Sequence, residues 1–136
     1  MVTAQGCGDP TQNTGIVIQK CRIGGTSDLL PVISSFPSYL GRPWREYSRT
    51  VVMQTSISNV IAPQGWHQWD RDFALNTLFY AEYQNTGAGA DTSRRVNWRG
   101  FKVITSASEA QAYTPGRFIA GSSWLGSAGF PYSLGL

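Results

Sequence analysis

Short runs of strand-forming residues, separated by long and irregular polar connections, constrain the fold of this chain more than any other feature. We expect strands in residues 14–23, 49–57, 60–61 and 78–84, which are rich in β-branched and aromatic residues. No Asn-Gly or Asp-Gly pair joins two of these runs, which disfavours tight hairpins. The connections also lack the amphipathic helices that βαβ units require.

This pattern predicts an all-β fold, and a parallel β-helix fits it best. Each coil of such a fold contributes a few short strands separated by loops of variable length. A β-sandwich also satisfies the strand pattern. The 136 residues are enough for one domain with an apolar core and too few for two ordinary ones. In the last predicted strand, one face should carry Phe79, Ala81 and Tyr83, and the other Leu78, Tyr80 and Glu82.

The last third of the chain has a different character. Ser106, followed three residues later by Glu109, has the spelling of a capping box and predicts a short helix through Tyr113. The Pro-Gly pair at 115–116 should end it. We expect the glycine-rich tail of residues 119–136 to pack its aromatic rings back onto the domain. These rings belong to Trp124, Phe130 and Tyr132.

The net charge of +3 favours polyanionic partners, either acidic polysaccharide or nucleic acid. The densest basic group lacks the aromatic-rich surroundings of RNA-binding modules, so we interpret it as a solvated surface and expect no nucleic-acid partner. It consists of Arg94, Arg95, Arg99 and Lys102. No run of about 18 apolar residues occurs, so we expect no membrane span.

Two cysteines, Cys7 and Cys21, form neither a disulfide framework nor a zinc-binding spacing. Pairing in an oxidising compartment is one option, and a buried Cys21 thiol within a strand is the other, which we favour. One histidine and scattered carboxylates predict no metal site. The first six residues lack the basic and apolar regions of a signal peptide, which favours Met1 as an internal methionine of a longer protein.

A serine-triad hydrolase is one candidate chemistry. His67 is the only histidine, Asp70 and Asp72 lie close by in the chain, and serines are plentiful. However, the chain has no Gly-x-Ser-x-Gly elbow. A single histidine beside two tryptophans is more often structural, so we disfavour this small-hydrolase hypothesis.

A second candidate site is the run Tyr-Leu-Gly-Arg-Pro-Trp at residues 39–44. Gly41 allows close backbone approach and Pro43 fixes the chain direction, so Arg42 and Trp44 can project towards one site. A guanidinium suits bidentate contact with a carboxylate, and an indole face suits a sugar ring. The alternative is a buried Trp44 beside a surface Arg42, and the residues alone do not separate the two.

Residues 36–52 resemble the LGRPW signature region of plant pectin methylesterases, or pectinesterases. Further segments resemble that family in the same order, and the similarity covers essentially the whole chain. They are residues 2–6, 12–16, 73–75, 82–83, 85–87, 94–96, 103–105 and 118–121. On this resemblance we identify residues 1–136 as the C-terminal part of a pectinesterase catalytic domain.

The resemblance implies a right-handed parallel β-helix with two catalytic aspartates in an open cleft. One aspartate attacks the methyl ester carbonyl of a galacturonate unit; the other protonates the leaving methanol and later activates water. Glutamine side chains stabilise the oxyanion. Carried over to this chain, Arg42 is the catalytic and substrate-binding residue that keeps the nucleophile ionised, and Trp44 lines the sugar subsite.

Two departures from the family bear on function. Its aspartate motifs precede the LGRPW run, and neither exists in this chain; Asp72-Phe73 resembles half of the second but follows Arg42. Cys7 stands where the family tends to carry a polar or basic residue. We therefore expect part of a longer pectin-demethylesterifying enzyme, inactive and poorly soluble by itself. The alternative is a truncated protein that binds acidic pectin without cutting it.

The resemblance also implies a setting for the enzyme. It predicts secretion to the plant cell wall, where a basic protein suits a matrix rich in polygalacturonate. It further predicts a monomer that acts on methyl-esterified pectin without a cofactor or metal.

Overall fold

The computed structural model describes all residues from 1 to 136. They form two compact units, residues 1–103 and residues 104–136, which are described separately. The first unit contains six short strands and one 3-10 helix. These are β1 (Ile16–Gln19), β2 (Arg22–Ile23), η1 (Leu30–Val32), β3 (Arg49–Met53), β4 (Ser56–Ile57), β5 (Phe79–Tyr83) and β6 (Phe101–Val103).

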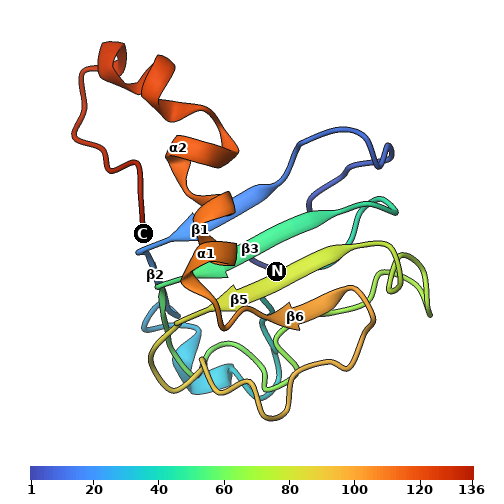
Figure 1. The fold of residues 1–136 in the computed structure, drawn as a ribbon. Helices are drawn as coiled ribbons and strands as arrows, with labels where there is room; N and C mark the ends of the chain where they lie inside the picture. Colours follow the sequence, from blue (N-terminus) through green and yellow to red (C-terminus); the bar gives the residue numbers. More distant parts are fainter. The chain divides into compact units, whose positions relative to one another are not determined.

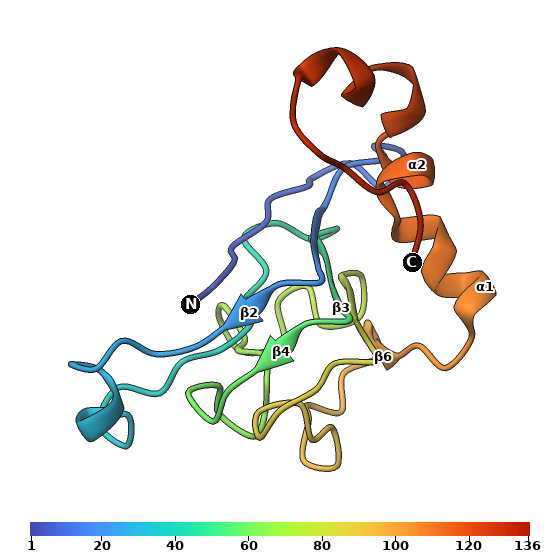
Figure 2. The ribbon, with the colours of Figure 1, turned by 90° about the vertical axis from the view of Figure 1, so that its left-hand side faces the viewer.

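All strand pairings are parallel. The larger sheet has the order β1-β3-β5-β6 (Figure 1), and the smaller one pairs β2 with β4 (Figure 2). The register stacks equivalent positions of successive turns, with Ile18 beside Val52 and Val52 beside Glu82. Apart from η1, the first unit is therefore built of parallel strands without hairpins, which agrees with the predicted all-β character.

The strand limits differ from the prediction where the backbone turns. Residues 14–23 and 49–57 were each expected to form one strand, but each contains two. Lys20, Gln54 and Gln84 directly follow β1, β3 and β5 with φ values of 53°, 51° and 47°. A left-handed residue ends an extended run, because it turns the chain out of the sheet direction. Side-chain hydrogen bonds replace the strand pairing there; Thr55 N donates to Asn85 Oδ1 at 3.0 Å.

One predicted strand is absent, and one observed strand was not predicted. Val60 and Ile61 do not form a strand, and residue 61 makes only an isolated bridge with Ser38. Both side chains are buried, so their apolar character reflects core packing. The strand β6 was not predicted, because its three residues include a central Lys102. Its extended conformation depends on tertiary pairing with β5.

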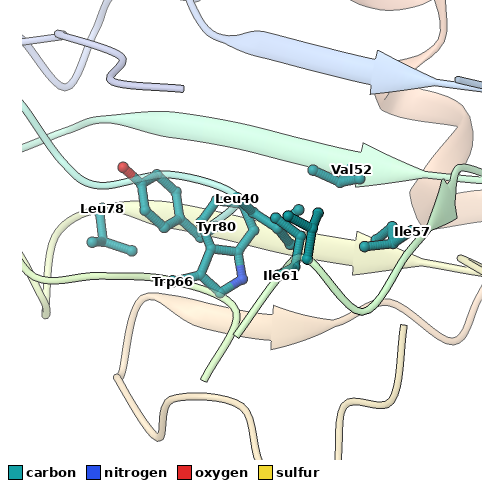
Figure 3. Packing of buried hydrophobic residues seen from close by; sticks show 8 residues of the cluster. Leu40, Val52, Ile57, Ile61, Trp66, Leu78 and Tyr80 are labelled. Atoms are coloured by element: carbon teal, nitrogen blue, oxygen red, sulfur yellow. The ribbon is translucent and has the colours of Figure 1, made fainter. Parts of the chain in front are cut away.

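The core of the first unit lies beside β3 and β5 (Figure 3). The Trp66 and Tyr80 rings stack at its centre, with centroids 4.3 Å apart. Two residues of β5 predicted to share a face, Tyr80 and Glu82, both turn towards Trp66: the first stacks on its ring and the second accepts a hydrogen bond from its indole Nε1. The buried cluster consists of Leu40, Val52, Ile57, Val60, Ile61, Trp66, Leu78 and Tyr80.

One member of the predicted solvated basic group is misassigned. Arg95 forms an ion pair with Glu82, with Nε 2.7 Å from Oε1, and both side chains are 2% exposed. The reason is electrostatic, because a buried carboxylate requires a charged or hydrogen-bonding partner. Arg94, Arg99 and Lys102 are exposed, as predicted.

The favoured assignment of the cysteines is also wrong. Cys21 is exposed, whereas Cys7 is buried, and both are free thiols. Cys21 lies in the turn between β1 and β2, directly after the left-handed Lys20, and therefore does not share the inward direction of a strand residue. The Cys7 Sγ lies 3.1 Å from the Asp9 carbonyl oxygen.

The second unit consists of short helical turns, which are α1 (Ala107–Ala110), η2 (Gln111–Tyr113), α2 (Pro115–Phe118), η3 (Gly121–Ser123) and η4 (Leu125–Ala128). The predicted helix is confirmed over residues 107–113, although the Ser106 side chain forms no capping hydrogen bond. Pro115 opens a new helix at a position where its missing N–H costs nothing. None of the chain's helices has the length and apolar character needed to cross a membrane.

The aromatic tail does not bury its rings as predicted. Trp124, Phe130 and Tyr132 remain 47%, 53% and 46% exposed. Local hydrogen bonds account for this arrangement: the Trp124 indole donates to the Ile119 carbonyl at 2.9 Å, five residues earlier. Residues 121–128 of the tail form 3-10 turns, and this short-range bond holds the Trp124 ring close to its own segment.

Candidate functional site

The segment that carries Arg42 lies between two other segments of the first unit. Isolated parallel bridges join Gly41 to Thr3 on one side and to Trp66 on the other. The Arg42 backbone N–H donates to the Thr3 carbonyl at 3.3 Å. The His67 N–H donates to the Gly41 carbonyl at 3.0 Å. Backbone pairing therefore holds Arg42 on both sides.

Gly41 is required for this close approach. A Cβ atom at this position would lie 2.2 Å from Thr3 Oγ1 and 3.2 Å from the Trp66 ring. No side chain larger than hydrogen fits between them without displacement. The glycine of the sequence motif thus allows the backbone directly before Arg42 to pack against Thr3 and the buried Trp66.

The Arg42 guanidinium has an unusual environment. Its Cζ lies 4.2 Å from the centre of the Trp69 ring, a cation–π geometry. Its Nε is buried and has no hydrogen-bond acceptor. No carboxylate of the chain forms an ion pair with it, and leaving a buried charged donor unpaired costs free energy. The site is therefore suited to receive an anionic acceptor.

The Trp44 side chain projects into solvent. It is 56% exposed, so the alternative of a buried Trp44 is wrong. Gly6 allows the ring to lie against the neighbouring backbone, because a Cβ there would come within 2.9 Å of Trp44 Cε3. Trp44 lines a pocket of about 340 Å³ with Arg45, Trp69, Asp70 and Phe73. The two indole rings offer faces on which a sugar ring can stack, and Arg45 and Asp70 place one charge of each sign beside them.

Trp69 is the site residue that sequence reasoning missed. It contacts Arg42 and also lines the pocket with Trp44. Trp66 and Trp69 are three residues apart, yet the first is 1% exposed and the second 41%. The polar neighbours Gln68 and Asp70 are the only sequence signal that sets Trp69 apart from a core residue.

His67 has the contacts of a structural residue. Its Nδ1 lies 2.6 Å from the Gln68 carbonyl oxygen, so this nitrogen carries the proton and donates. Its ring meets Tyr39 edge-on, with centroids 4.8 Å apart. No serine hydroxyl or carboxylate bonds to either ring nitrogen, and the structure does not assemble a serine triad around His67.

A pectinesterase family model matches residues 1–122. The chain belongs to the pectinesterase family. Its whole length is 76% identical to pectinesterase 3 of Citrus sinensis and 74% identical to a pectinesterase of Daucus carota. Among solved structures, the pectin methylesterase from carrot matches 99% of the chain, with a TM-score of 0.98 and 74% identity.

A more distant family member shares part of the fold. The pectin methylesterase from Aspergillus niger matches 77% of the chain, with a TM-score of 0.63 and 32% identity. These proteins are longer than the chain. The chain spans 23% of the citrus protein and 43% of the carrot protein. It covers 42% of the carrot structure and 32% of the Aspergillus structure.

The Gly41 contact leads to a stability prediction. In a full-length pectinesterase carrying these residues, Gly41→Ala should lower the free energy of unfolding by about 1–3 kcal/mol, because overpacking forces neighbours to shift. Thermal unfolding measures this change. Gly8→Ala is the matched control, since no atom lies within 4 Å of its added Cβ. Equal melting temperatures for the two variants would contradict the close packing of Gly41.

Proposed function

We propose that the chain forms one wall of a pectinesterase site within a longer enzyme. That enzyme hydrolyses methyl esters of polygalacturonate by an aspartyl-esterase mechanism. The observation that carries the proposal is the buried Arg42 Nε without an acceptor, in a guanidinium that no carboxylate of the chain contacts. The carboxylate that completes the site then comes from outside these 136 residues.

In this mechanism the chain supplies positioning and charge. The carboxylate that the rest of the enzyme supplies attacks the ester carbonyl of a galacturonate unit, and a second carboxyl group protonates the departing methanol. Arg42 holds the first carboxylate by charge-assisted hydrogen bonds, which favour its ionised form and aim its oxygen. Trp44 and Trp69 flank the pocket that takes the sugar ring. The second carboxyl group then activates water to release the acid.

The finer features of the fold are part of the proposal. Parallel strands in β1-β3-β5-β6 and β2-β4 order support coils of a right-handed parallel β-helix. In such a solenoid each coil covers the next, which is consistent with residues 1–136 as the C-terminal part of a catalytic domain. The enzyme acts as a secreted monomer of the plant cell wall, on methyl-esterified pectin.

A binding protein without esterase activity is the second candidate function. The pocket lined by Trp44 and Trp69 supports it, because two indole rings can stack on a sugar ring without any catalytic carboxylate. Sequencing the transcript upstream of Met1 distinguishes the two. An in-frame extension with two aspartate motifs supports the enzyme, and a start codon behind a stop supports the binding protein.

Substitution of Arg42 tests the esterase proposal. In the full-length enzyme, Arg42→Ala should lower kcat for methanol release about 100-fold, because the nucleophile loses its alignment and its charge partner. Arg42→Lys should recover only part of this loss, since an ammonium keeps the charge but not the planar fork.

Arg99→Ala serves as the matched control, because Arg99 is exposed and lies outside the pocket. Its kcat should equal that of the unmodified enzyme. If Arg42→Ala retained the kcat of this control, Arg42 would have no part in the reaction and the proposed site would be wrong.

A further inference from the structure

We propose that Trp69 is a positioning residue for Arg42, in addition to lining the pocket. This inference rests on the proposed function, because it gives Trp69 its effect through the arginine that orients the nucleophile. The starting observation is the contact itself. The Arg42 Cζ lies 4.2 Å from the centre of the Trp69 ring.

The geometry of stacking explains why an indole suits this role. A guanidinium is planar, and its N–H donors point outward from its edge. When its face lies on an aromatic ring, the attraction restrains the plane of the group without consuming any of those donors. The Arg42 side chain has no acceptor for its Nε in the chain, and stacking on Trp69 leaves the donors at the edge of the guanidinium free for a carboxylate. A hydrogen-bonding partner in the place of Trp69 would occupy the donors that catalysis needs.

The backbone before Trp69 places the ring over Arg42. Trp66 is buried, and the next residue, His67, donates its N–H to the Gly41 carbonyl at 3.0 Å. Trp69 follows two residues later, and Arg42 directly follows Gly41 in the other segment. The hydrogen bond between His67 and Gly41 thus joins the two segments close to the stacked pair, which limits how far the Arg42 and Trp69 side chains can separate.

The backbone after Trp69 is held in uncommon conformations. Arg71 and Ala74 have φ values of 47° and 65°, in the left-handed region that residues with a Cβ rarely adopt. Such residues persist when the surrounding structure over-determines them, and they cluster at functional sites. Local bonds close this loop: the Phe73 N–H donates to the Asp70 carbonyl at 3.0 Å, and the Leu78 N–H to the Ala74 carbonyl at 2.8 Å. The loop therefore presents Trp69 from a constrained backbone.

A simpler role for Trp69 is that of a sugar platform. Its ring is 41% exposed and lines the pocket with Trp44, so it has surface for both roles. The two roles differ in kinetics. Loss of a platform weakens substrate and transition state alike and raises KM, whereas loss of alignment lowers kcat.

Alignment also has a pH signature. The reaction requires the nucleophilic carboxylate in its ionised form. A guanidinium held against that carboxylate lowers its pKa, and a guanidinium that swings away allows the pKa to rise. A misaligned Arg42 therefore shifts the acid limb of the kcat profile to higher pH, which loss of a sugar platform does not do.

The test compares Trp69→Leu with Trp69→Phe in the full-length enzyme, with methanol release measured over a pH series. We expect Trp69→Leu to lower kcat about 10- to 100-fold, since small misplacements of catalytic groups have effects of this size. Its acid limb should rise by about 1 pH unit. Trp69→Phe keeps a weaker cation–π partner and should stay within about threefold of the unmodified kcat.

The double variant Arg42→Ala/Trp69→Leu tests the positioning role separately from the proposed function. In the Arg42→Ala variant, Trp69→Leu should add little to the loss in kcat, because the effects of residues that act through one another are not additive. If Trp69→Leu raised KM and left kcat and the acid limb unchanged, the positioning role would be overturned. If Arg42→Ala itself left kcat unchanged, the proposed function would fail first.

Discussion

Glu82→Ala is expected to lower the free energy of unfolding by about 3–5 kcal/mol, because it leaves a buried charge without its partner. The Glu82 carboxylate accepts from Arg95 Nε at 2.7 Å, from Arg95 Nη2 at 3.0 Å and from Trp66 Nε1 at 3.1 Å. Both side chains of the ion pair are 2% exposed. After the substitution, Arg95 retains only the carbonyls of Pro63 and Gly89 as acceptors.

Urea unfolding of the full-length pectinesterase measures the loss. Glu46→Ala is the matched control, because Glu46 is exposed and its side chain forms no ion pair. That change should stay within about 0.5 kcal/mol of the unmodified protein. The double variant Glu82→Leu/Arg95→Met should be more stable than Glu82→Ala, since it removes both charges. Equal stability of Glu82→Ala and Glu46→Ala would show that the pair contributes nothing.

Trp66→Ala is expected to lower the free energy of unfolding by about 3–5 kcal/mol as well, through the cavity it leaves. The ring is 1% exposed and stacks on Tyr80 with centroids 4.3 Å apart. It also lies against Gly41, where an added Cβ would be 3.2 Å from the ring. We therefore expect kcat to fall together with stability, because Arg42 loses the support beneath its backbone.

Two further variants separate the contributions of Trp66. Trp66→Phe keeps an aromatic ring and loses the bond to Glu82, which should cost about 1.5–3 kcal/mol for a hydrogen bond to a charged group. Trp69→Ala removes the exposed indole three residues later and should change the free energy of unfolding far less. Thermal and urea unfolding report both. If Trp69→Ala proved as destabilising as Trp66→Ala, the assignment of Trp69 to the exposed site instead of the core would be wrong.

The strand pattern was readable because strands need β-branched and aromatic residues, and β3 and β5 are rich in both. The arginine and the tryptophan of the LGRPW run could be proposed because Gly41 allows close backbone approach and Pro43 fixes the chain direction between them. Family resemblance extended these local signals to the whole chain. The family match over residues 1–122 agrees with that identification.

Other features depend on neighbours that are distant in the chain. Trp66 and Trp69 share a residue type, but only the three-dimensional structure assigns one to the core and the other to the site. Arg95 has the same residue type as its exposed neighbour Arg94, and only the ion pair with Glu82 in the structure shows that Arg95 is buried. Cys21 falls within the strand expected for residues 14–23, and a left-handed Lys20 turns it towards solvent. These outcomes depend on packing, which residue type does not encode.

The sequence by itself determined the all-β character, the pectinesterase resemblance and the candidate role of Arg42, because these follow from local residue preferences and from one specific motif. Only the tertiary structure decided that the Arg42 Cζ lies 4.2 Å from the centre of the Trp69 ring and that Arg42 Nε is buried without an acceptor. The physical reason is that both features require contact between segments that are distant in the chain and are joined by parallel backbone bridges. Residues 41 and 66 become neighbours only when successive turns of the chain are laid side by side.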